Sequence, residues 1–239
     1  MLDILIEVDR ICKKHNIKYW LSSGTLLGAV KHGGFIPWDD DLDIELLRED
    51  YIRLLKILQN ELPEQFALQT EKTAPRHLSY YAKVRDKKSA FFDTLPQGRI
   101  QKYQGAFIDI FPLERSWEWC HKISKVFFNL YTWKLIEKKG FLFGLYTLLR
   151  SFQTYILHPL LRMISITAPR NILRHSLGVY FNSTRLGNEI FPLTEIEFES
   201  YKFPIPKNSD AYLTRLFGNY MELPCNIEFH FYHKKIELC

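Results

Sequence analysis

The stretch YWLSSGTLLGAVKHGGFIPWDDDLDI, residues 19–44, decides the fold of this chain. A short apolar run predicts a strand over residues 17–21. Residues 22–25 provide hydroxyl side chains that can cap a helix, and the apolar spacing that follows predicts that a helix begins there. Two glycines and a proline in residues 32–38 exclude a continuing helix there. From Leu42 acidic and apolar residues alternate, which predicts a strand with one charged face.

Outside this stretch the apolar spacing predicts further helices and strands. A helix is expected from Leu2 to about His15, and a second one covers residues 48–60. Further expected elements are strands at 78–85, at 105–111 closed by Pro112, and at 195–203, and a helix at 210–217. There is no internal repeat, and the mixed order predicts one α+β domain over residues 1–239, with a mixed β-sheet flanked by helices.

Composition excludes several protein classes. The 239 residues are 46% apolar and 25% charged, which is ordinary for a folded chain and excludes disorder. No apolar run approaches the roughly 20 residues of a membrane-spanning helix, and the first residues lack the pattern of an export signal. The four cysteines form no C-x-x-C pair, which is typical of reduced thiols in a cytoplasmic protein.

The net charge of +5 is concentrated in one segment. Residues 121–175 contain nine Lys or Arg against one acid, so this segment carries +8 and the rest of the chain −3. It is also rich in Phe, Tyr and Trp, and we expect a helical, basic-aromatic insertion over residues 116–185. A solvated helical face is one interpretation, and contact of residues 121–175 with an anionic membrane surface is the other. Nucleic acid would also suit such a segment but is not expected.

Four carboxylates within residues 39–43 form the strongest chemical signal. On a strand, Asp41 and Asp43 would project from the same face about 7 Å apart, close enough to share a hard divalent cation. Asp109 is the expected third ligand, because an acid flanked by apolar residues in a strand is costly unless it is paired or bound to a cation. The pattern predicts a site for Mg²⁺ or Mn²⁺; a solvated acidic turn is the alternative.

The turn at residues 22–25 adds a second chemical feature. Backbone N–H groups at a helix N-terminus favour a phosphate. Carboxylates for a divalent cation beside a phosphate-binding turn are the components of phosphoryl or nucleotidyl transfer.

The same residues resemble a known family. Residues 19–44 are similar to the signature of the LicD family of phosphocholine transferases, and further similarities lie at residues 48–51, 108–113, 203–206 and 212–221. The resemblance implies a nucleotidyltransferase-like fold with the helical insertion within it. Residues 120–185 contribute little to the resemblance.

The resemblance also implies an activity. It is a metal-dependent transfer of phosphocholine, or a related phospho-alcohol, from CDP-choline or a similar CDP-alcohol to a hydroxyl of a cell-surface glycan or lipopolysaccharide precursor. The implied acceptor is a lipid-linked glycan, and the implied place is the cytoplasm, at the inner face of the membrane. Two alternatives stay open. One is a nucleotidyltransferase or a phosphosugar or phosphoalditol transferase with the same site, and the other is a non-catalytic glycan- or lipid-binding relative.

Roles for individual residues follow from the resemblance. It assigns Asp41, Asp43 and Asp109 as metal ligands and catalytic carboxylates, in agreement with the pattern above. Asp109 would help to remove the proton of the acceptor hydroxyl.

The phosphate-binding residues are assigned in the same way. Ser23, Gly24 and Thr25 match the turn that holds the donor's phosphates. Lys83 and Arg85 would neutralise the pyrophosphate, with solvated basic residues as the alternative.

Five residues have weaker functional signals. His32 could act as a general base and Trp38 could stack on a cytosine or cover a choline cation, although both residue types also suit the turning and packing of a loop. Cys225, His230 and His233 could bind a metal, but their spacing lacks a second cysteine and favours an ordinary structural role.

Overall fold

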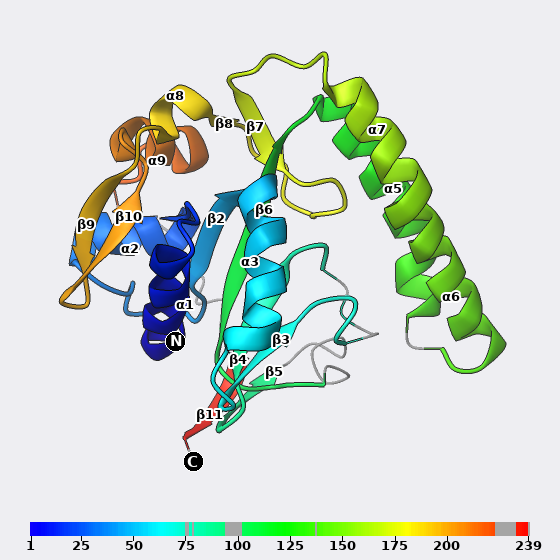
Figure 1. The fold of residues 1–239 in the computed structure, drawn as a ribbon, viewed down its shortest axis with the longest axis horizontal. Helices are drawn as coiled ribbons and strands as arrows, with labels where there is room; N and C mark the ends of the chain where they lie inside the picture. The colour runs from blue at the N-terminus through cyan, green and yellow to red at the C-terminus, as the bar shows by residue number, and fades with distance from the viewer. Residues whose placement is uncertain (75–76, 78, 94–101, 137, 223–232, 239) are drawn as a thin grey trace.

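The computed structural model describes residues 1–74, 77, 79–93, 102–136, 138–222 and 233–238, and it confirms the α+β class. Within these residues the main sheet has seven strands in the order β1-β2-β6-β4-β3, with β7 beside β6 and β8 beside β7 (Figure 1). The strands are β1 (Trp20–Leu21), β2 (Asp43–Leu47), β3 (Phe66–Gln69), β4 (Ala82–Asp86), β5 (Ser89–Asp93), β6 (Phe107–Arg115), β7 (Ile172–His175), β8 (Arg185–Leu186), β9 (Thr194–Phe198), β10 (Tyr201–Ile205) and β11 (His233–Leu238). The helices are α1 (Leu2–Lys14), α2 (Ser23–His32), α3 (Arg48–Glu61), α5 (Glu118–Leu135), α6 (Phe141–Phe152), η1 (Gln153–Leu157), α7 (His158–Ser165), α8 (Gly187–Ile190) and α9 (Ser209–Phe217).

Strand β6 is the centre of the sheet. Residues 109–113 pair with β2 on one edge, in parallel, and residues 107–110 pair with β4 on the other edge, antiparallel. Beyond the end of β4, residues Leu113, Glu114 and Arg115 pair with β7 instead. Because side chains alternate along a strand, β2, β4 and β6 each divide their residues between two different faces.

One face of the sheet is the apolar core. Ile44, Leu46, Ile108 and Ile110 are fully buried there. Helices α1 and α3 cover this face, which Figure 1 shows with α3 lying across β6. The predicted helix at 2–15 forms as expected, since its apolar residues recur every three or four positions and are buried against the sheet. The opposite face carries the polar residues of the site.

The prediction that Pro112 closes its strand is wrong. Strand β6 continues to Arg115, and Pro112 is in register with Leu46 of β2. The Pro112 carbonyl accepts a hydrogen bond from Ser176 N (2.8 Å) on the other edge. A residue's N–H and C=O point to the same edge of a strand, so the N–H that proline lacks would face the gap between β4 and β7.

Two other strand predictions also need correction. Only Trp20 and Leu21 of the predicted strand 17–21 pair with β2. The predicted strand 195–203 is instead the hairpin of β9 and β10, turned by Glu199 and Ser200, which both have positive φ. A two-residue turn of this kind requires left-handed backbone, and neither residue is a glycine, so the sequence did not signal it.

The helical segment forms an arm beside the sheet. We call residues 118–165, which contain α5, α6, η1 and α7, the arm; α5 runs alongside the other helices at one edge of the molecule (Figure 1). The helices end at Ser165, and the chain then returns to the main sheet as β7 and β8, before the expected limit at 185. In the described residues, no helix has both the length and the hydropathy needed to cross a bilayer.

Candidate active site

Three charged residues form a row across three neighbouring strands. Asp43 of β2 is in register with Asp109 of β6, and Asp109 is in register with Lys83 of β4. Register partners project from the same face of a sheet, so the two carboxylates and the ammonium group are neighbours. Asp109 N donates to Leu42 O (2.7 Å), which extends the β2–β6 pairing to the residue before Asp43. The prediction that Asp43, Asp109 and Lys83 lie on strands of one sheet is therefore confirmed. Asp41, expected on the same strand as Asp43, instead precedes β2.

Lys83 is the present partner of Asp109. Its Nζ lies 2.5 Å from Asp109 Oδ1 and 3.7 Å from the centre of the Phe107 ring. Tyr81, two residues earlier on the same side of the chain, also lowers the pKa of Asp109 through its hydroxyl group. The ion pair with Lys83 of β4 is therefore the main interaction of the Asp109 carboxylate.

The N-terminus of α2 is attached to β2 beside the carboxylates. Asp43 N donates to Thr25 Oγ1 (2.8 Å), and Ser22 N donates to Asp43 O (3.1 Å). Ser23, the first helical residue, has a φ of 47°, a conformation that costs a non-glycine residue energy and that recurs at functional sites. The turn predicted to bind phosphate therefore lies directly next to the predicted metal ligand.

Asp39 lies over this turn. A Cβ atom added to Gly24 would come within 2.7 Å of Asp39 Oδ2, so a side chain at position 24 would displace the Asp39 carboxylate. The Asp39 side chain also hydrogen-bonds to Asp41. A carboxylate close to the first turn of α2 agrees with the preference of helix N-termini for anions.

The carboxylates raise one another's pKa. Burial, followed by the negative charges of Asp39 and Asp109, raises the pKa of Asp41 to about 8. Burial and the neighbouring carboxylates also raise the pKa of Asp43 well above its usual range. For Asp109, burial raises the pKa and the charge of Lys83 opposes the shift. Crowded carboxylates of this kind ionise together only when a cation compensates their charge.

This donor set fits a hard divalent cation in charge and in chemistry, because carboxylate oxygens are the ligands that Mg²⁺ and Mn²⁺ prefer. In the part of the chain that the structure describes, no three His, Cys, Asp or Glu side chains are grouped closely enough to hold a metal ion as they stand. Joint coordination by Asp41, Asp43 and Asp109 therefore requires side chains to turn from their present positions.

Arg85 lies on the same face as Lys83 but is engaged elsewhere. Its Nε donates to Gln69 Oε1 (2.6 Å), and its guanidinium also donates to Gly105 O (2.9 Å). The side chain is buried, so its contact with a pyrophosphate stays a prediction.

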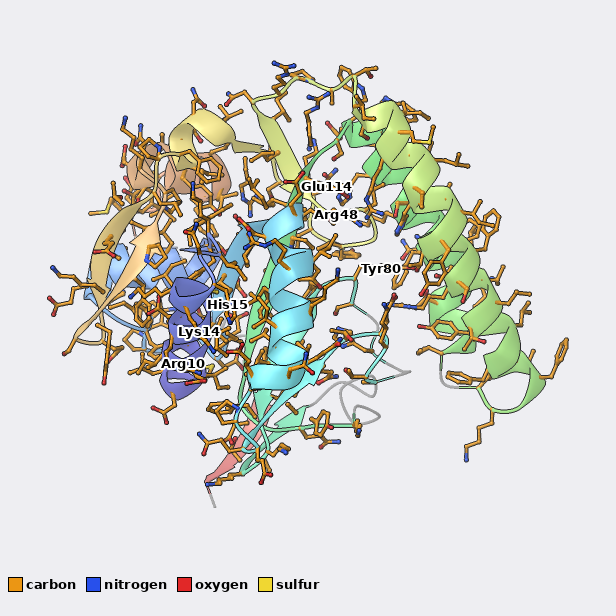
Figure 2. The ribbon with its side chains drawn as sticks, in the orientation of Figure 1. Arg10, Lys14, His15, Arg48, Tyr80 and Glu114 are labelled. Carbon is orange, nitrogen blue, oxygen red and sulfur yellow. The ribbon has the colours of Figure 1, made fainter. Side chains whose placement is uncertain are left out.

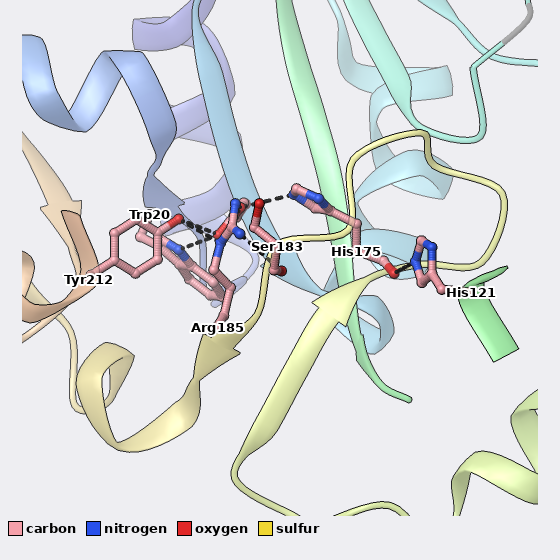
Figure 3. Close-up of polar contacts among 7 residues, drawn as sticks. Trp20, His121, His175, Ser183, Arg185 and Tyr212 are labelled. Carbon is pink, nitrogen blue, oxygen red and sulfur yellow. Dashed lines mark hydrogen bonds and ion pairs between the residues drawn. The ribbon is translucent and has the colours of Figure 1, made fainter. Parts of the chain in front are cut away.

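A buried ion network lies two residues further along β2. Glu45 accepts hydrogen bonds from Arg185 (2.8 Å), Tyr212 (2.8 Å) and Trp20 (3.2 Å), and lies 3.0 Å from His175 Nε2 (Figure 3). Burial opposes ionisation of Glu45, but the charge of Arg185 and the hydrogen bond from His175 outweigh it and lower the pKa to about 2. The network holds β2 to β1, β7, β8 and α9 immediately beside Asp43.

The other predicted residues lie apart from this row. The rings of His32 and Trp38 contact each other edge-on, with centroids 6.2 Å apart. His32, the last residue of α2, is exposed, and Trp38 is half-buried in the loop that follows the helix. Cys225 and His230 fall outside the described residues, and the metal site suggested for them and His233 stays a prediction.

Sequence reasoning missed three residues of this region. Tyr81 could have been found from the two-residue period that places it beside Lys83, and Asp39 from its place in the acidic cluster. Glu45 had no comparable signal, because its partner Arg185 is 140 positions away.

A separate cavity of about 450 Å³ lies between α3 and the arm. Arg48, Tyr51, Tyr80, Tyr81 and Arg162 are among its lining residues. Figure 2 shows Arg48 on α3 and Tyr80 on the side that faces the arm. Tyr81 contacts both this cavity and Asp109, so it joins the two regions.

Comparison with known proteins places this site in context. A family model described as LicD/FKTN/FKRP, nucleotidyltransferase domain, matches residues 16–163, more than half of the chain and all of the row above. The chain is 26% identical to the lipopolysaccharide cholinephosphotransferase LicD of Haemophilus influenzae, over 93% of this chain and 89% of that protein. Two shorter similarities cover an uncharacterised protein of Rickettsia prowazekii, 52% identical over 24% of this chain and 22% of that one, and the human ribitol 5-phosphate transferase FKRP, 53% identical over 14% of this chain and 7% of that one.

Proposed function

The chain belongs to the LicD family, and from that premise we propose that it is a phosphotransferase that moves phosphocholine, or a related phospho-alcohol, from a CDP-linked donor to a hydroxyl of a cell-surface glycan or lipopolysaccharide precursor. The observation that carries the proposal is the register of Asp43 with Asp109 beside the N-terminus of α2. The similarity to the Haemophilus cholinephosphotransferase, which extends over nearly the whole of both chains, supports this choice of reaction.

Asp41, Asp43 and Asp109 would hold Mg²⁺ or Mn²⁺. The metal, when bound, neutralises charge on the donor's diphosphate and on the leaving group. Gly24 and Thr25 would place backbone N–H groups of α2 against the donor's phosphates, because the N-terminus of a helix favours bound anions. Asp39 would have to yield part of this space, because its carboxylate now lies over Gly24.

The transfer needs a base and a counter-charge. The acceptor oxygen attacks the phosphorus of the phosphocholine group, the bond to the CMP oxygen breaks, and CMP leaves. Asp109 would take the proton of the acceptor hydroxyl; burial raises its pKa, which suits a general base. Once its ion pair with Asp109 is broken, Lys83 would balance the negative charge that develops on the donor.

A second candidate reaction is transfer of a phosphoalditol with the same site. It is favoured by the similarity to a protein named ribitol 5-phosphate transferase, which is short but 53% identical. Both reactions share the diphosphate donor and the hydroxyl acceptor, so they would differ in the pocket for the alcohol and not in the carboxylates.

The experiment that tests the proposal is a donor panel. The protein is incubated with Mg²⁺, CDP-choline, CDP-ethanolamine or CDP-ribitol, and a glycan acceptor, and CMP release is measured. We expect acceptor-dependent CMP release with one donor, abolished by EDTA and by Asp43→Asn. Full turnover by Asp43→Asn contradicts the site assignment. Metal-independent donor binding in calorimetry without any turnover would identify a binding-only relative instead.

A further inference from the structure

The arm exposes many large apolar side chains. Thirteen of them are at least 43% exposed, and we call six of these, two from each of its three α-helices, the apolar face: Val126, Leu130, Leu148, Phe152, Leu160 and Met163. Single exposed apolar residues are ordinary, but a set of this size on adjacent helices indicates a binding surface.

The apolar face is continuous from one helix to the next. On α5, exposed apolar residues recur at 119, 123, 126 and 130, the spacing of a single helical stripe. The ring of Phe127 lies 5.7 Å, centre to centre, from the ring of Phe152 and so joins this stripe to α6. The buried residues of α5, such as Cys120, Ser124 and Phe128, lie on its other side.

Four cations of the basic segment are already paired with carboxylates. Glu114 forms ion pairs with Arg162 (2.7 Å) and Arg48 (3.3 Å) where the arm meets α3. Figure 2 shows Glu114 and Arg48 close together near the end of β6. Four of the nine basic residues in 121–175 have a carboxylate partner: Lys122, Arg150, Arg162 and Arg174. Because these four positive charges are already balanced by carboxylates, the net charge of +8 of residues 121–175 overstates the charge available to a partner.

Three lysines remain at one end of the apolar face. Lys134, Lys138 and Lys139 lie at the end of α5 and in the turn before α6. All three are exposed, and none forms an ion pair within the described residues. Phe141, at the start of α6 beside this turn, is 85% exposed.

From these observations we infer that the apolar face and the lysines at 134, 138 and 139 dock the arm onto an anionic lipid surface. The apolar side chains enter the boundary between headgroups and acyl chains, and the ammonium groups contact lipid phosphates. A second copy of this chain fits the face less well. Arms packed in parallel would bring two sets of the same three lysines together, and arms packed antiparallel would leave these lysines without anionic partners. The inference names where a lipid-linked acceptor of the proposed function would be met, and to that extent it rests on that function.

The test is cosedimentation of the full chain with vesicles. One set contains phosphatidylcholine alone, and the other about one third phosphatidylglycerol, a fraction that gives an appreciable negative surface potential. We expect binding to the anionic vesicles and weaker binding to the neutral ones. Replacing all three lysines by Gln should weaken binding to anionic vesicles by about a hundredfold, since each lysine near such a surface contributes about fivefold.

Matched variants separate the face from the rest of the surface. The double variant Leu130→Ser with Leu148→Ser should lose binding to both vesicle types. The control, Phe217→Ser with Met221→Ser, removes two exposed apolar side chains outside the arm and should bind like the natural chain. Replacing Lys18, Lys202 and Lys207 by Gln is the corresponding charge control, because all three are exposed and lie outside the arm. Circular dichroism verifies that each variant is folded.

Three outcomes would overturn the inference. The first is no binding to anionic vesicles by the natural chain, and the second is an equal loss in the control variants. The third is a dimer in light scattering that is dissociated by Leu130→Ser with Leu148→Ser while vesicles are not bound. CMP release with a water-soluble acceptor is measured in parallel, and it should be unchanged in the arm variants. Failure of the docking inference can therefore be distinguished from failure of the proposed reaction.

Discussion

Lys83 Nζ lies 2.5 Å from Asp109 Oδ1, and the two residues are register partners on β4 and β6. The pair is nearly buried, so the charge of each depends on the other. Burial lowers the pKa of Lys83 and raises that of Asp109, while each partner's charge opposes these shifts. We expect that a cation bound by Asp109 would weaken this ion pair and leave the Lys83 ammonium group able to contact the donor.

Replacing Lys83 by Met should lower the rate of CMP release by about a hundredfold, the usual cost of losing one preorganised charge-stabilising group. Without the ammonium charge the pKa of Asp109 rises further, so its ionised form requires a higher pH. The acid side of the pH–rate profile should therefore shift to higher pH. Lys83→Arg retains the charge and should leave the profile in place, and a profile that is equally shifted in Lys83→Arg would contradict this role for the charge.

Asp41→Asn should abolish activity without destabilising the protein. The pKa of Asp41 is about 8, above its value in the unfolded chain, so its contribution to stability is full at low pH and is lost as the pH rises through 8. Metal-free protein should therefore become less stable between pH 4 and 9, and the variant less so. Urea unfolding at several pH values measures this, and Mg²⁺ should raise the unfolding midpoint of the natural chain only.

Gly24→Ala should lower activity by about tenfold to a hundredfold, the effect of a small displacement in a catalytic site. Its Cβ would lie 2.7 Å from Asp39 Oδ2, so the Asp39 carboxylate must move. The matched control is Gly144→Ala in α6, where the added Cβ meets nothing within 4 Å. That control should be stabilised by about 1 kcal/mol through helix propensity and keep full activity. Equal activity of the two variants would show that the position of Asp39 is unimportant.

Glu45→Gln should destabilise the protein by about 3–5 kcal/mol, because it leaves the buried Arg185 without a counter-charge. The urea midpoint should fall with no change in the m-value. Glu7→Gln removes the partner of the exposed Arg10 instead, and no measurable change is expected. If Glu45→Gln unfolds at the same urea concentration as the natural chain, the network does not stabilise β2.

His158 should make the protein sensitive to mild acid. Burial, followed by the charge of Arg162, lowers its pKa to about 3, so the folded chain keeps it neutral while the unfolded chain binds a proton near pH 6.5. Stability is therefore lost as the pH falls below 6.5, by about 2 kcal/mol at pH 5 from this residue. His158→Gln can still hydrogen-bond to Ser124 and cannot titrate, so its stability should fall less over the same range. Parallel slopes in the two proteins would exclude His158 as the cause.

Part of the site could be predicted from the acidic residues of the sequence. Asp43 and Asp109 could be assigned to a charged site on strands, because an acid within an apolar alternation is costly unless a cation or a partner compensates it. Their register could not be predicted, since it depends on pairing between β2 and β6, strands that are far apart in the sequence. Nor could the partner of Asp109 be identified, because Lys83 approaches it from a third strand.

Local errors in the fold have a similar origin. A proline usually ends a strand. At Pro112, however, the missing N–H would face the gap between β4 and β7, which pair with β6 in succession. Glu199 and Ser200 form a turn in left-handed backbone without glycine, which no local propensity favours.

By itself the sequence determined the α+β class, the helix spans of α1, α3 and α9, and the residue types of a phosphotransferase site, because periodicity, capping and turn chemistry act over a few residues. Only the tertiary structure decided which charges meet. It pairs Glu45 with Arg185 and leaves three lysines of the arm without an ion pair in the described residues. The physical reason is that electrostatic interactions depend on distance and burial in the folded chain, and neither quantity is encoded in a local pattern.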